Sequence, residues 1–250
     1  MALVMDGSIS TVEDLRALDS AILDTSLGEN IDLIKKLQVA EDAVQLELAV
    51  FLLRAANQNG VSGPGIDLSN VVVTNPLRRW HTLRTLVEVY SDAYNSQFND
   101  RYLGKWKHYS KLTRETSDLL FEYGVGIVQN PVPRAPKPIV TEGALGGPVT
   151  QYFVRIAWRG ATGTTGALSE PAVFPAPNGE LMYVGSGPAP AGVTGFHVYL
   201  GETAESATLQ NGTPILPGQL WVMPVGGLVP RQVPASEQRP DYYIRRNRTR

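Results

Sequence analysis

The chain has 250 residues, 43% of them hydrophobic, no cysteine and a formal net charge of −2. This size suits one large or two modest globular cores, while the lack of cysteine excludes disulfides and thiolate metal sites and is compatible with assembly in a reducing cytosol. The first residues show no secretion signal, and no apolar stretch approaches the roughly 20 residues of a membrane span. We therefore expect a soluble protein without a membrane partner.

The composition changes abruptly at residue 131. Two prolines precede this position and sixteen follow it. Acids outnumber bases by 17 to 12 before it, whereas the last 22 residues carry six arginines and two acids. Such changes favour separate folding units, so we predict an α+β multidomain protein. Its parts are an α-helical domain over residues 1–130, a Pro-rich linker over 131–138, a β-sandwich over 139–228 and an extended basic C-terminal arm over 229–250.

Two helices are expected in the first 60 residues. Ser10 and Glu13 have the spacing of a capping box, and apolar residues recur at helical intervals after them, so a short helix is predicted over 11–23. A long helix is predicted from Glu29 to Asn57. Its apolar stripe consists of Ile31, Ile34, Leu37, Val44, Leu48, Phe51 and Leu52.

Residues 60–75 are rich in glycine and then in valine, which predicts a loop with a short strand over 70–74. Asn75 and Pro76 suit the start of the next helix, and a further helix is predicted over 100–123, before Gly124. These segments together predict a helical bundle. Aromatic residues recur at helical spacing on the last two helices and are interpreted as core packing rather than as a stacking platform for bases or sugars. They are Trp80, Tyr90, Tyr94, Tyr102, Trp106 and Tyr109.

Short alternating segments separated by glycine and proline follow between Ile139 and Leu228, which is typical of a β-sandwich. In the segment 150–159, apolar side chains alternate with polar ones, so one face of this strand is expected to lie in the core. The glycine-rich residues 160–166 are interpreted as a hairpin tip rather than a phosphate loop, because no lysine follows them.

Four segments of this β region carry a resemblance to a known family. They are TQYFVRIAWRG at 150–160, LSEPAVF at 168–174, GVTGFHVYLGET at 192–203 and ATLQNGTPILPGQLWVMP at 207–224. This pattern resembles the fibronectin type III-like modules of structural proteins in tailed bacteriophages. The resemblance implies a fibronectin type III or immunoglobulin-like β-sandwich.

The helix order of the first half looks like that of head-to-tail connector adaptors. This likeness implies a virion protein of the neck or tail, assembled in the host bacterial cytoplasm as a ring, commonly of twelve copies, beneath the portal protein. The other implied partners are tail or nozzle proteins, capsid or fibre through the β-sandwich, and packaged DNA that passes without specific binding. Residues 1–57 carry ten acids and four bases, so Glu13, Asp14, Glu41 and Asp42 are expected near the channel or another subunit.

The C-terminal arm is predicted to dock on a partner chain. Two tyrosines and an isoleucine stand among arginines, and aromatic residues and arginine are enriched at interface hot spots. The predicted docking residues are Tyr242, Tyr243, Ile244, Arg245, Arg246 and Arg248. We expect that deleting residues 242–250 leaves both domains folded but weakens attachment to the portal. A solvated terminus and a nonspecific nucleic-acid contact are the alternatives.

No residue pattern points to catalysis, to a cofactor or to a metal site. His81, His108 and His197 are far apart in the sequence, and none has a second metal ligand at a suitable spacing. We therefore expect a protein that is not an enzyme. Two alternatives to the adaptor remain. One is another neck or tail component, and the other is a cell-surface or glycan-binding module with a helical oligomerising stalk, for which the candidate sugar-stacking residues are Tyr183, Tyr199 and Trp221.

Overall fold

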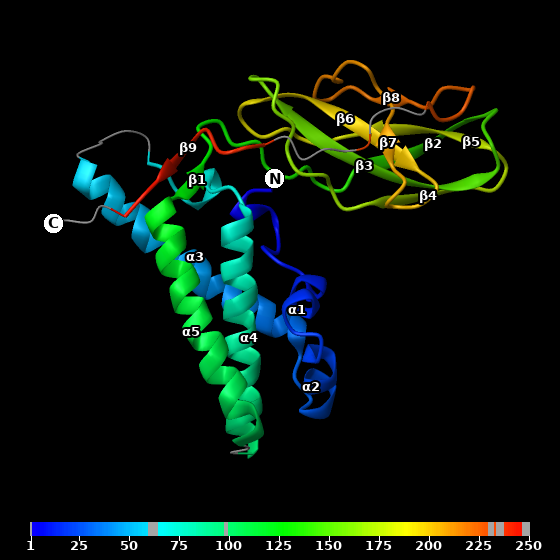
Figure 1. Cartoon of the computed structure of the whole chain (residues 1–250). Coiled ribbons are helices and arrows are strands. Elements are labelled where there is room, and N and C mark those ends of the chain that lie inside the picture. The colour runs from blue at the N-terminus through cyan, green and yellow to red at the C-terminus, as the bar shows by residue number, and fades with distance from the viewer. Residues whose placement is uncertain (1, 60–64, 98–99, 230–232, 234–237, 247–250) are drawn as a thin grey trace. The chain divides into compact units, whose positions relative to one another are not determined.

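The computed structural model describes residues 2–59, 65–97, 100–229, 233 and 238–246. The chain forms two compact units (Figure 1). The helical unit comprises Gly7–Val128 and Pro240–Arg250, and the β unit comprises Met1–Asp6 and Gln129–Arg239. Helices in the first half followed by antiparallel sheets confirm the predicted α+β class. The two chain ends differ from the prediction. The first six residues belong to the β unit and not to the helical domain, and the segment from Pro240 belongs to the helical unit and not to a separate arm.

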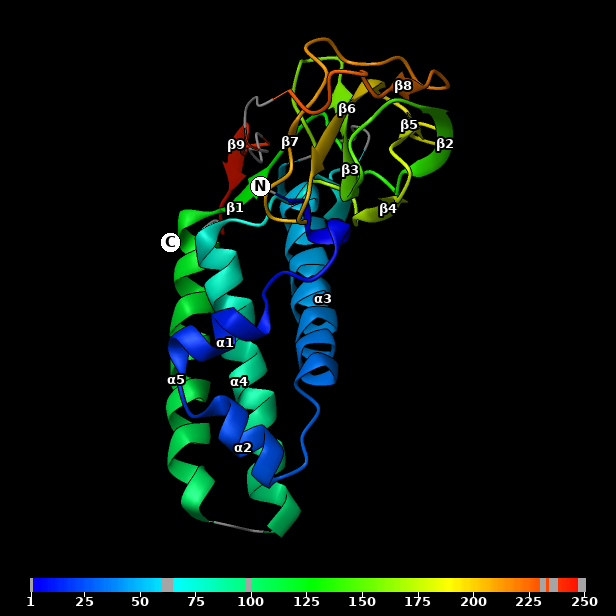
Figure 2. The ribbon, with the colours of Figure 1, turned by 90° about the vertical axis from the view of Figure 1, so that its right-hand side faces the viewer.

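The helical unit is built on a pair of long helices that lie side by side, α4 and α5, with a third long helix, α3, against α4 (Figures 1 and 2). Its elements are α1 (Val12–Leu18), α2 (Ile22–Gly28), α3 (Leu33–Asn59), the 3-10 turn η2 (Leu68–Asn70), α4 (Asn75–Gln97), α5 (Asp100–Tyr123), β1 (Val125–Ile127) and β9 (Tyr242–Ile244). The predicted helix start at Asn75 and Pro76 and the predicted helix over 100–123 are confirmed.

Local sequence explains the ends of α4 and α5. Pro76 stands in the first turn of α4, where its missing N–H costs no intrahelical bond. Gly124 follows α5 with φ of 117°, a conformation that residues with a Cβ rarely adopt, and its N–H donates to the Leu120 carbonyl at 2.8 Å. Between these ends, Trp80, Tyr90, Tyr102 and Tyr109 are buried, which confirms the core-packing interpretation for these four. Tyr94 and Trp106 are only partly buried and stack on each other at the edge of the core.

The predicted first helix is in fact two helices, and its predicted cap is wrong by one residue. The capping box of α1 is formed by Thr11 and Asp14 rather than by Ser10 and Glu13. The hydroxyl of Ser10 contacts Nδ1 of His81 instead, at 2.7 Å. Asp19 then ends α1 in an extended conformation, and α2 starts at Ile22.

The long helix α3 begins at Leu33, four residues later than predicted. Asn30 just before it has φ of 55°, and the carboxylate of Asp32 accepts hydrogen bonds from the first amides of the helix, Ile34 at 3.0 Å and Lys35 at 3.2 Å. The buried stripe of α3 contains Leu37, Val44, Leu48 and Leu52, as predicted. Ile34 was predicted in this stripe, but it is exposed because it lies about 100° around the helix from Leu33, which is buried.

The β unit contains two antiparallel sheets that share one core. The elements are the 3-10 turn η1 (Val4–Asp6), β2 (Ile139–Leu145), β3 (Thr150–Gly160), β4 (Ala172–Ala176), β5 (Glu180–Gly185), β6 (Val193–Gly201), β7 (Thr208–Leu209) and β8 (Trp221–Val222). One sheet has the order β4-β3-β6-β7 and the other β2-β5-β8. Trp158 of β3 and Phe196 of β6 meet edge to face in the core, with ring centroids 6.3 Å apart.

The Pro-rich segment 131–138 is part of the β unit and not a separate linker. Val132 is only 2% exposed and, with Ala135, joins the core of the two sheets. The backbone N–H of Val132 donates to Oε1 of the fully buried Gln238 at 2.8 Å. The N–H of Arg134 donates to Asp6 at 2.6 Å, which holds the N-terminal residues in the same unit. The segment is extended because of its prolines, yet its apolar side chains pack inward.

Candidate functional site

The C-terminal segment that was predicted to dock on a partner lies on the helical unit of its own chain. Residues Tyr242–Ile244 form β9 and pair antiparallel with β1, in the register Val125 with Ile244, Gly126 with Tyr243 and Ile127 with Tyr242. The N–H of Asp241 extends this ladder by donating to the Ile127 carbonyl at 2.8 Å. Arg248 lies outside the described residues. The sequence alone missed this strand because β1 has only three residues.

Two glycines allow β9 to approach β1 closely. A Cβ atom on Gly126 would lie 2.7 Å from Cγ of Pro240, and one on Gly124 would lie 2.8 Å from Cβ of Tyr243. Both distances are too short for carbon atoms that are not bonded to each other. Gly124, which follows α5, and Gly126, within β1, therefore both accommodate the C-terminal segment.

The other edge of β1 is occupied by the predicted short strand at 70–74. The N–H of Val72 donates to the Gly126 carbonyl at 3.0 Å, and Val71 forms an isolated bridge with Ile127. Asn70 forms two hydrogen bonds with Val128. Its side-chain amide donates to the Val128 carbonyl at 2.9 Å, and the Val128 N–H donates to the Asn70 carbonyl at 2.9 Å. Strand β1 thus lies between the residues that precede α4 and the end of the chain.

Two of the predicted docking arginines bind α5. The N–H of Arg246 donates to the Phe121 carbonyl at 2.8 Å, while its guanidinium lies 5.1 Å above the Phe121 ring and 3.2 Å from Asp118. Nε of Arg245 donates to the Tyr123 carbonyl at 3.0 Å. The exposed ion pair with Asp118 contributes at most about 1 kcal/mol. The backbone hydrogen bonds between β1 and β9 therefore contribute most of the free energy that binds the C-terminal segment. Deleting residues 242–250, which was expected to leave both domains folded, would remove this ladder from the helical unit.

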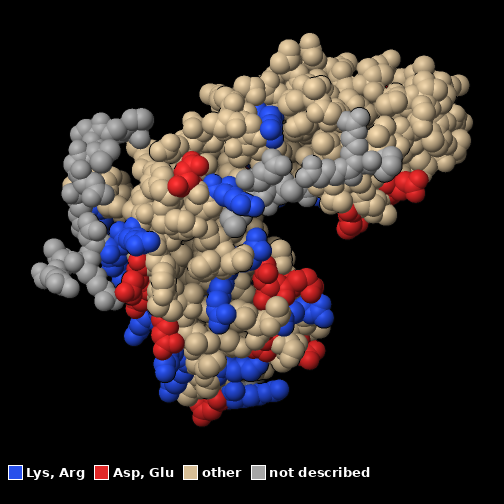
Figure 3. All heavy atoms as spheres, turned by 45° about the horizontal axis from the view of Figure 1, so that its top comes forward, with Lys and Arg blue, Asp and Glu red and all other residues tan. Residues whose placement is uncertain are grey.

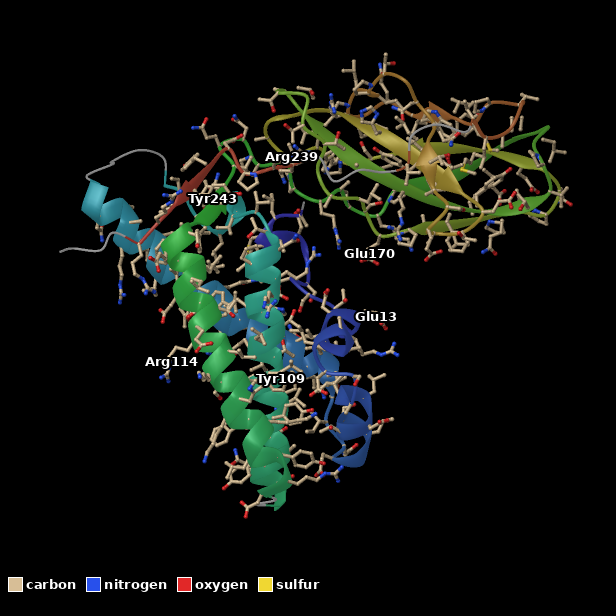
Figure 4. All side chains as sticks on the ribbon, in the orientation of Figure 1. Glu13, Tyr109, Arg114, Glu170, Arg239 and Tyr243 are labelled. Carbon is tan, nitrogen blue, oxygen red and sulfur yellow. The ribbon has the colours of Figure 1, made fainter. Side chains whose placement is uncertain are left out.

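The side chain of Tyr243 lines an apolar groove beside the C-terminal end of α5 (Figure 4). This α4–α5 groove has a volume of about 650 Å³. Its lining comprises Thr74, Asn75, Pro76, Arg79, Leu112, Glu115, Thr116, Leu119, Leu120, Tyr123, Gly124 and Tyr243. Leu119, Tyr123 and Tyr243 are more than half exposed, although large apolar side chains of this kind favour burial.

A buried polar cluster fixes the junction of α1 and α2 to the α4–α5 pair. The carboxylate of Asp19 accepts hydrogen bonds from Lys105 at 2.8 Å, Tyr90 at 2.5 Å and Tyr109 at 3.1 Å. Tyr109 points toward α4 in Figure 4. Each donor comes from α4 or α5, so a single carboxylate joins three segments of the unit.

The cluster changes the acid–base properties of its members. Burial alone would raise the pKa of Asp19, but hydrogen bonds from Lys105 and Tyr90 hold that pKa below its usual value. Burial would lower the pKa of Lys105, but the hydrogen bonds to Asp19 and Tyr90 raise it above the ordinary value. Burial and the charge of Asp19 raise the pKa of Tyr109 to about 12. At neutral pH the cluster is therefore an ion pair with two neutral tyrosines, which is a structural arrangement rather than a nucleophile or a general base.

The three histidines do not converge on a site. His81 is completely buried and lies between Ser10 and the Leu37 carbonyl, which its Nε2 contacts at 3.1 Å. Burial lowers the pKa of His81 to about 4, so its ring is neutral and holds three segments together. His197 is buried in β6, and His108 is exposed on α5. Across the described part of the chain, no group of three His, Cys, Asp or Glu residues could hold a metal ion.

Two of the three aromatic residues considered for sugar stacking are buried. Tyr199 of β6 and Trp221 of β8 are each less than 10% exposed, so their rings cannot stack on a ligand without rearrangement. Tyr183 of β5 is partly exposed. It lies beside Val222 of β8 and Thr141 of β2 in the three-stranded sheet.

Charged side chains are unevenly distributed. On the face drawn in Figure 3, Lys, Arg, Asp and Glu crowd the helical unit, while other residues dominate the β unit. Of the acids singled out in the sequence, Glu13 pairs with Arg16 at 3.0 Å and Asp14 serves the cap of α1. Burial, with Asp42 nearby, raises the pKa of Glu41. Their proximity to a channel stays a prediction.

A scan of protein-family models finds no match to this chain, and a search of curated proteins finds no significant relative. Among the described residues, every helix is too short or too polar to cross a membrane.

Proposed function

We propose that this chain is a structural virion protein of a tailed bacteriophage, a head-to-tail connector adaptor that forms a ring between portal and tail. The observation that carries the proposal is the sequence pattern of the β unit. TQYFVRIAWRG coincides with the whole of β3, Thr150–Gly160. LSEPAVF leads into β4, GVTGFHVYLGET contains β6, and the last of the four segments contains β7 and β8.

The arrangement of these segments suits a fibronectin type III-like sandwich. Strands β4, β3, β6 and β7 are neighbours in one sheet, and β8 belongs to the other. Sheets of four and three strands around one core are the layout expected of this class of module. We take the β unit to be the part that reaches capsid, tail or fibre.

Exposed apolar side chains on the β unit support a role in protein contacts. Leu220, Val222 and Ile139 are each more than half exposed and belong to, or adjoin, the three-stranded sheet. Leu220 lies against Gly185 of β5, beside Ile139 of β2. Clusters of exposed apolar residues are typical of protein interaction surfaces.

The helical unit suits a ring through which DNA passes. With ten acids and four bases in residues 1–57, its first helices would repel phosphates and not bind them. We take the C-terminal arm to be the part that reaches the adjoining ring. In a ring of twelve copies, twelve short tethered segments act together, so weak individual contacts give strong attachment.

The alternatives differ in class and in prediction. Another neck or tail component would use the same parts in a different layer of the particle. A glycan-binding module with a helical stalk would need exposed aromatic rings on the β unit, and the burial of Tyr199 and Trp221 argues against it.

Mass spectrometry of purified mature particles of the virus whose genome encodes this chain tests the proposal. We expect the chain in the particles at a constant ratio to the portal protein. Absence from the particles would rule out the adaptor. A screen of the full-length chain against immobilised glycans separates the alternatives, since a reproducible, sugar-specific signal would support the glycan reader instead.

A further inference from the structure

Helix α3 carries a second apolar face opposite the buried one. Its members are Val39, Ala43, Leu46, Val50 and Leu53, spaced alternately by four and three residues, and we call this face the α3 ridge. Leu46 is 67% exposed and Leu53 is 65% exposed. Apolar residues at this spacing form the seam by which one helix packs against another.

Among the described residues, the contacts of α3 leave Leu46 and Leu53 of the α3 ridge mostly exposed. Leu46 lies two residues from the buried Leu48, which places the two side chains about 200° apart around the helix. The side of α3 that contains Leu48 faces the core of the unit. An exposed seam on the opposite side therefore calls for a helix-binding surface elsewhere.

The α4–α5 groove is such a surface, and it lies on the side of α5 that faces away from α3. The Phe121 ring of α5 packs against Phe51 of α3, with centroids 4.7 Å apart. Leu119 and Tyr123, which line the groove, are each two residues from Phe121 and so about 200° around α5. The ridge and the groove of one copy cannot meet, but those of two copies can.

The charges beside the two surfaces are complementary. Asp42 and Arg54 flank the ridge, while Arg79 and Glu115 line the groove. Asp42, Arg54 and Arg79 form no ion pair with any described residue, and Glu115 lies 3.8 Å from Lys111. A helix seated in the groove would bring Asp42 of one copy near Arg79 of the next.

We infer that the α3 ridge of one copy packs into the α4–α5 groove of the next copy. The contact joins two different surfaces, so each copy keeps a free ridge at one end and a free groove at the other. Such head-to-tail contacts produce a closed ring or a filament, unlike a twofold contact, which stops at a dimer. The inference rests on the proposed function only for closure into a ring, because the contact itself follows from the helical unit.

The size of the contact indicates a weak pairwise association. The ridge spans 15 residues, Val39 to Leu53, so the covered face is roughly 21 Å long and roughly 10 Å wide, an area of about 200 Å². The area of this face is far below the ~800 Å² that each partner buries in a stable complex. The contact is thus expected to form transiently in solution and to accumulate where other partners align the copies.

Disulfide trapping detects such a transient contact, and the chain contains no cysteine of its own. Leu46→Cys and Leu119→Cys would be prepared as separate full-length proteins, with Val173→Cys, exposed on β4, as the control. Under mild oxidation we expect disulfide-linked dimers when the first two are mixed, but not when either is oxidised alone. A chain with both substitutions should give a ladder of multimers. The inference would be overturned if Leu46→Cys formed no more dimer with Leu119→Cys than with the Val173→Cys control. Equally efficient dimer formation by Leu46→Cys alone would also overturn it.

A charge swap tests the orientation. Adding Asp42→Arg to the Leu46→Cys chain should reduce the trapped yield roughly twofold to fivefold, and Arg79→Asp in the Leu119→Cys chain should restore it. Failure of the restoring variant would contradict the proposed pairing. A failed trap with the chain still present in particles would refute this contact alone, whereas a successful trap with the chain absent from particles would refute the proposed function alone.

Discussion

The ammonium group of Lys105 lies 2.8 Å from Oδ2 of Asp19, a residue 86 positions earlier in the chain. Asp19 separates α1 from α2, and Lys105 stands near the start of α5. Tyr90 and Tyr109 bind the same carboxylate, so the buried charge of Asp19 fixes the junction of the first two helices against the α4–α5 pair.

Replacing Lys105 by Met should lower the free energy of unfolding of the helical unit by about 2–3 kcal/mol, because Asp19 then stays buried without a cation. The cost is below that of a fully buried pair since Lys105 retains contact with water. Urea unfolding monitored by circular dichroism measures it, and Lys107→Met on the exposed surface of α5 is the control.

The contribution of the pair depends on pH in a defined direction. The pKa of Asp19 is lowered by folding, so its contribution is complete above its ordinary value of 3.8 and is lost as the pH falls through the lower folded value. The pKa of Lys105 is raised, so its contribution is complete below 10.5 and is lost at higher pH. The difference in the free energy of unfolding between the wild type and Lys105→Met should therefore be largest between pH 3.8 and pH 10.5. A gap that grows in acid would contradict the ion pair.

Protonation of His81 should destabilise the folded chain. Its pKa falls from 6.5 to about 4 on folding, so the unfolded chain binds the proton more tightly and stability decreases as the pH drops between these values. Over this pH range the free energy of unfolding should decrease by about 3 kcal/mol. Unfolding curves at several pH values should show this component in the wild type and in His108→Gln, but not in His81→Gln. Equal pH profiles for all three proteins would show that folding does not lower the pKa of His81.

Gly126 and Gly104 should respond in opposite directions to alanine. In Gly126→Ala the new methyl group meets Pro240 at 2.7 Å, so β9 must move and stability should drop by about 1–3 kcal/mol. Gly104 lies within α5 with open space around it, so Gly104→Ala should stabilise the unit by about 0.5–1 kcal/mol. Thermal unfolding compares the two, and a harmless Gly126→Ala would mean that β9 does not bind β1 closely in solution.

Strand β9 should contribute to the stability of the helical unit. A chain ending at Arg239 loses the ladder to β1 and the bond from Arg246 to Phe121, so we expect a loss of about 2–4 kcal/mol. A chain ending at Arg246 keeps both and should unfold at the wild-type temperature. Differential scanning calorimetry distinguishes them, and identical melting temperatures would restore the view of the whole segment as a free arm.

Sequence patterns predicted those parts of the fold that depend on neighbouring residues. The start of α4 follows from Pro76 and the end of α5 from Gly124, and β3 follows from alternation, because capping and periodicity are local signals. Leu37, Val44 and Leu48 were placed in the core for the same reason.

The parts that sequence patterns missed depend on residues far apart in the chain. Asp19 divides the first helix because its partner is Lys105, and Val132 is buried because Gln238 holds its backbone from 106 positions away. The same holds for the C-terminal segment, where composition identified the interaction-prone Tyr242–Ile244 but could not reveal that their partner is β1. The α3 ridge passed unnoticed because an exposed and a buried apolar face on one helix cannot be separated without the burial of each residue.

The most direct test of the adaptor assignment is a single-particle reconstruction of the neck of the mature virus particle. We expect the helical unit in a ring between portal and tail, with α1 nearer the channel than the β unit and α3 of each copy in the α4–α5 groove of its neighbour. A reconstruction in which the β unit lines the channel, or in which no density at the neck accommodates this chain, would contradict the account.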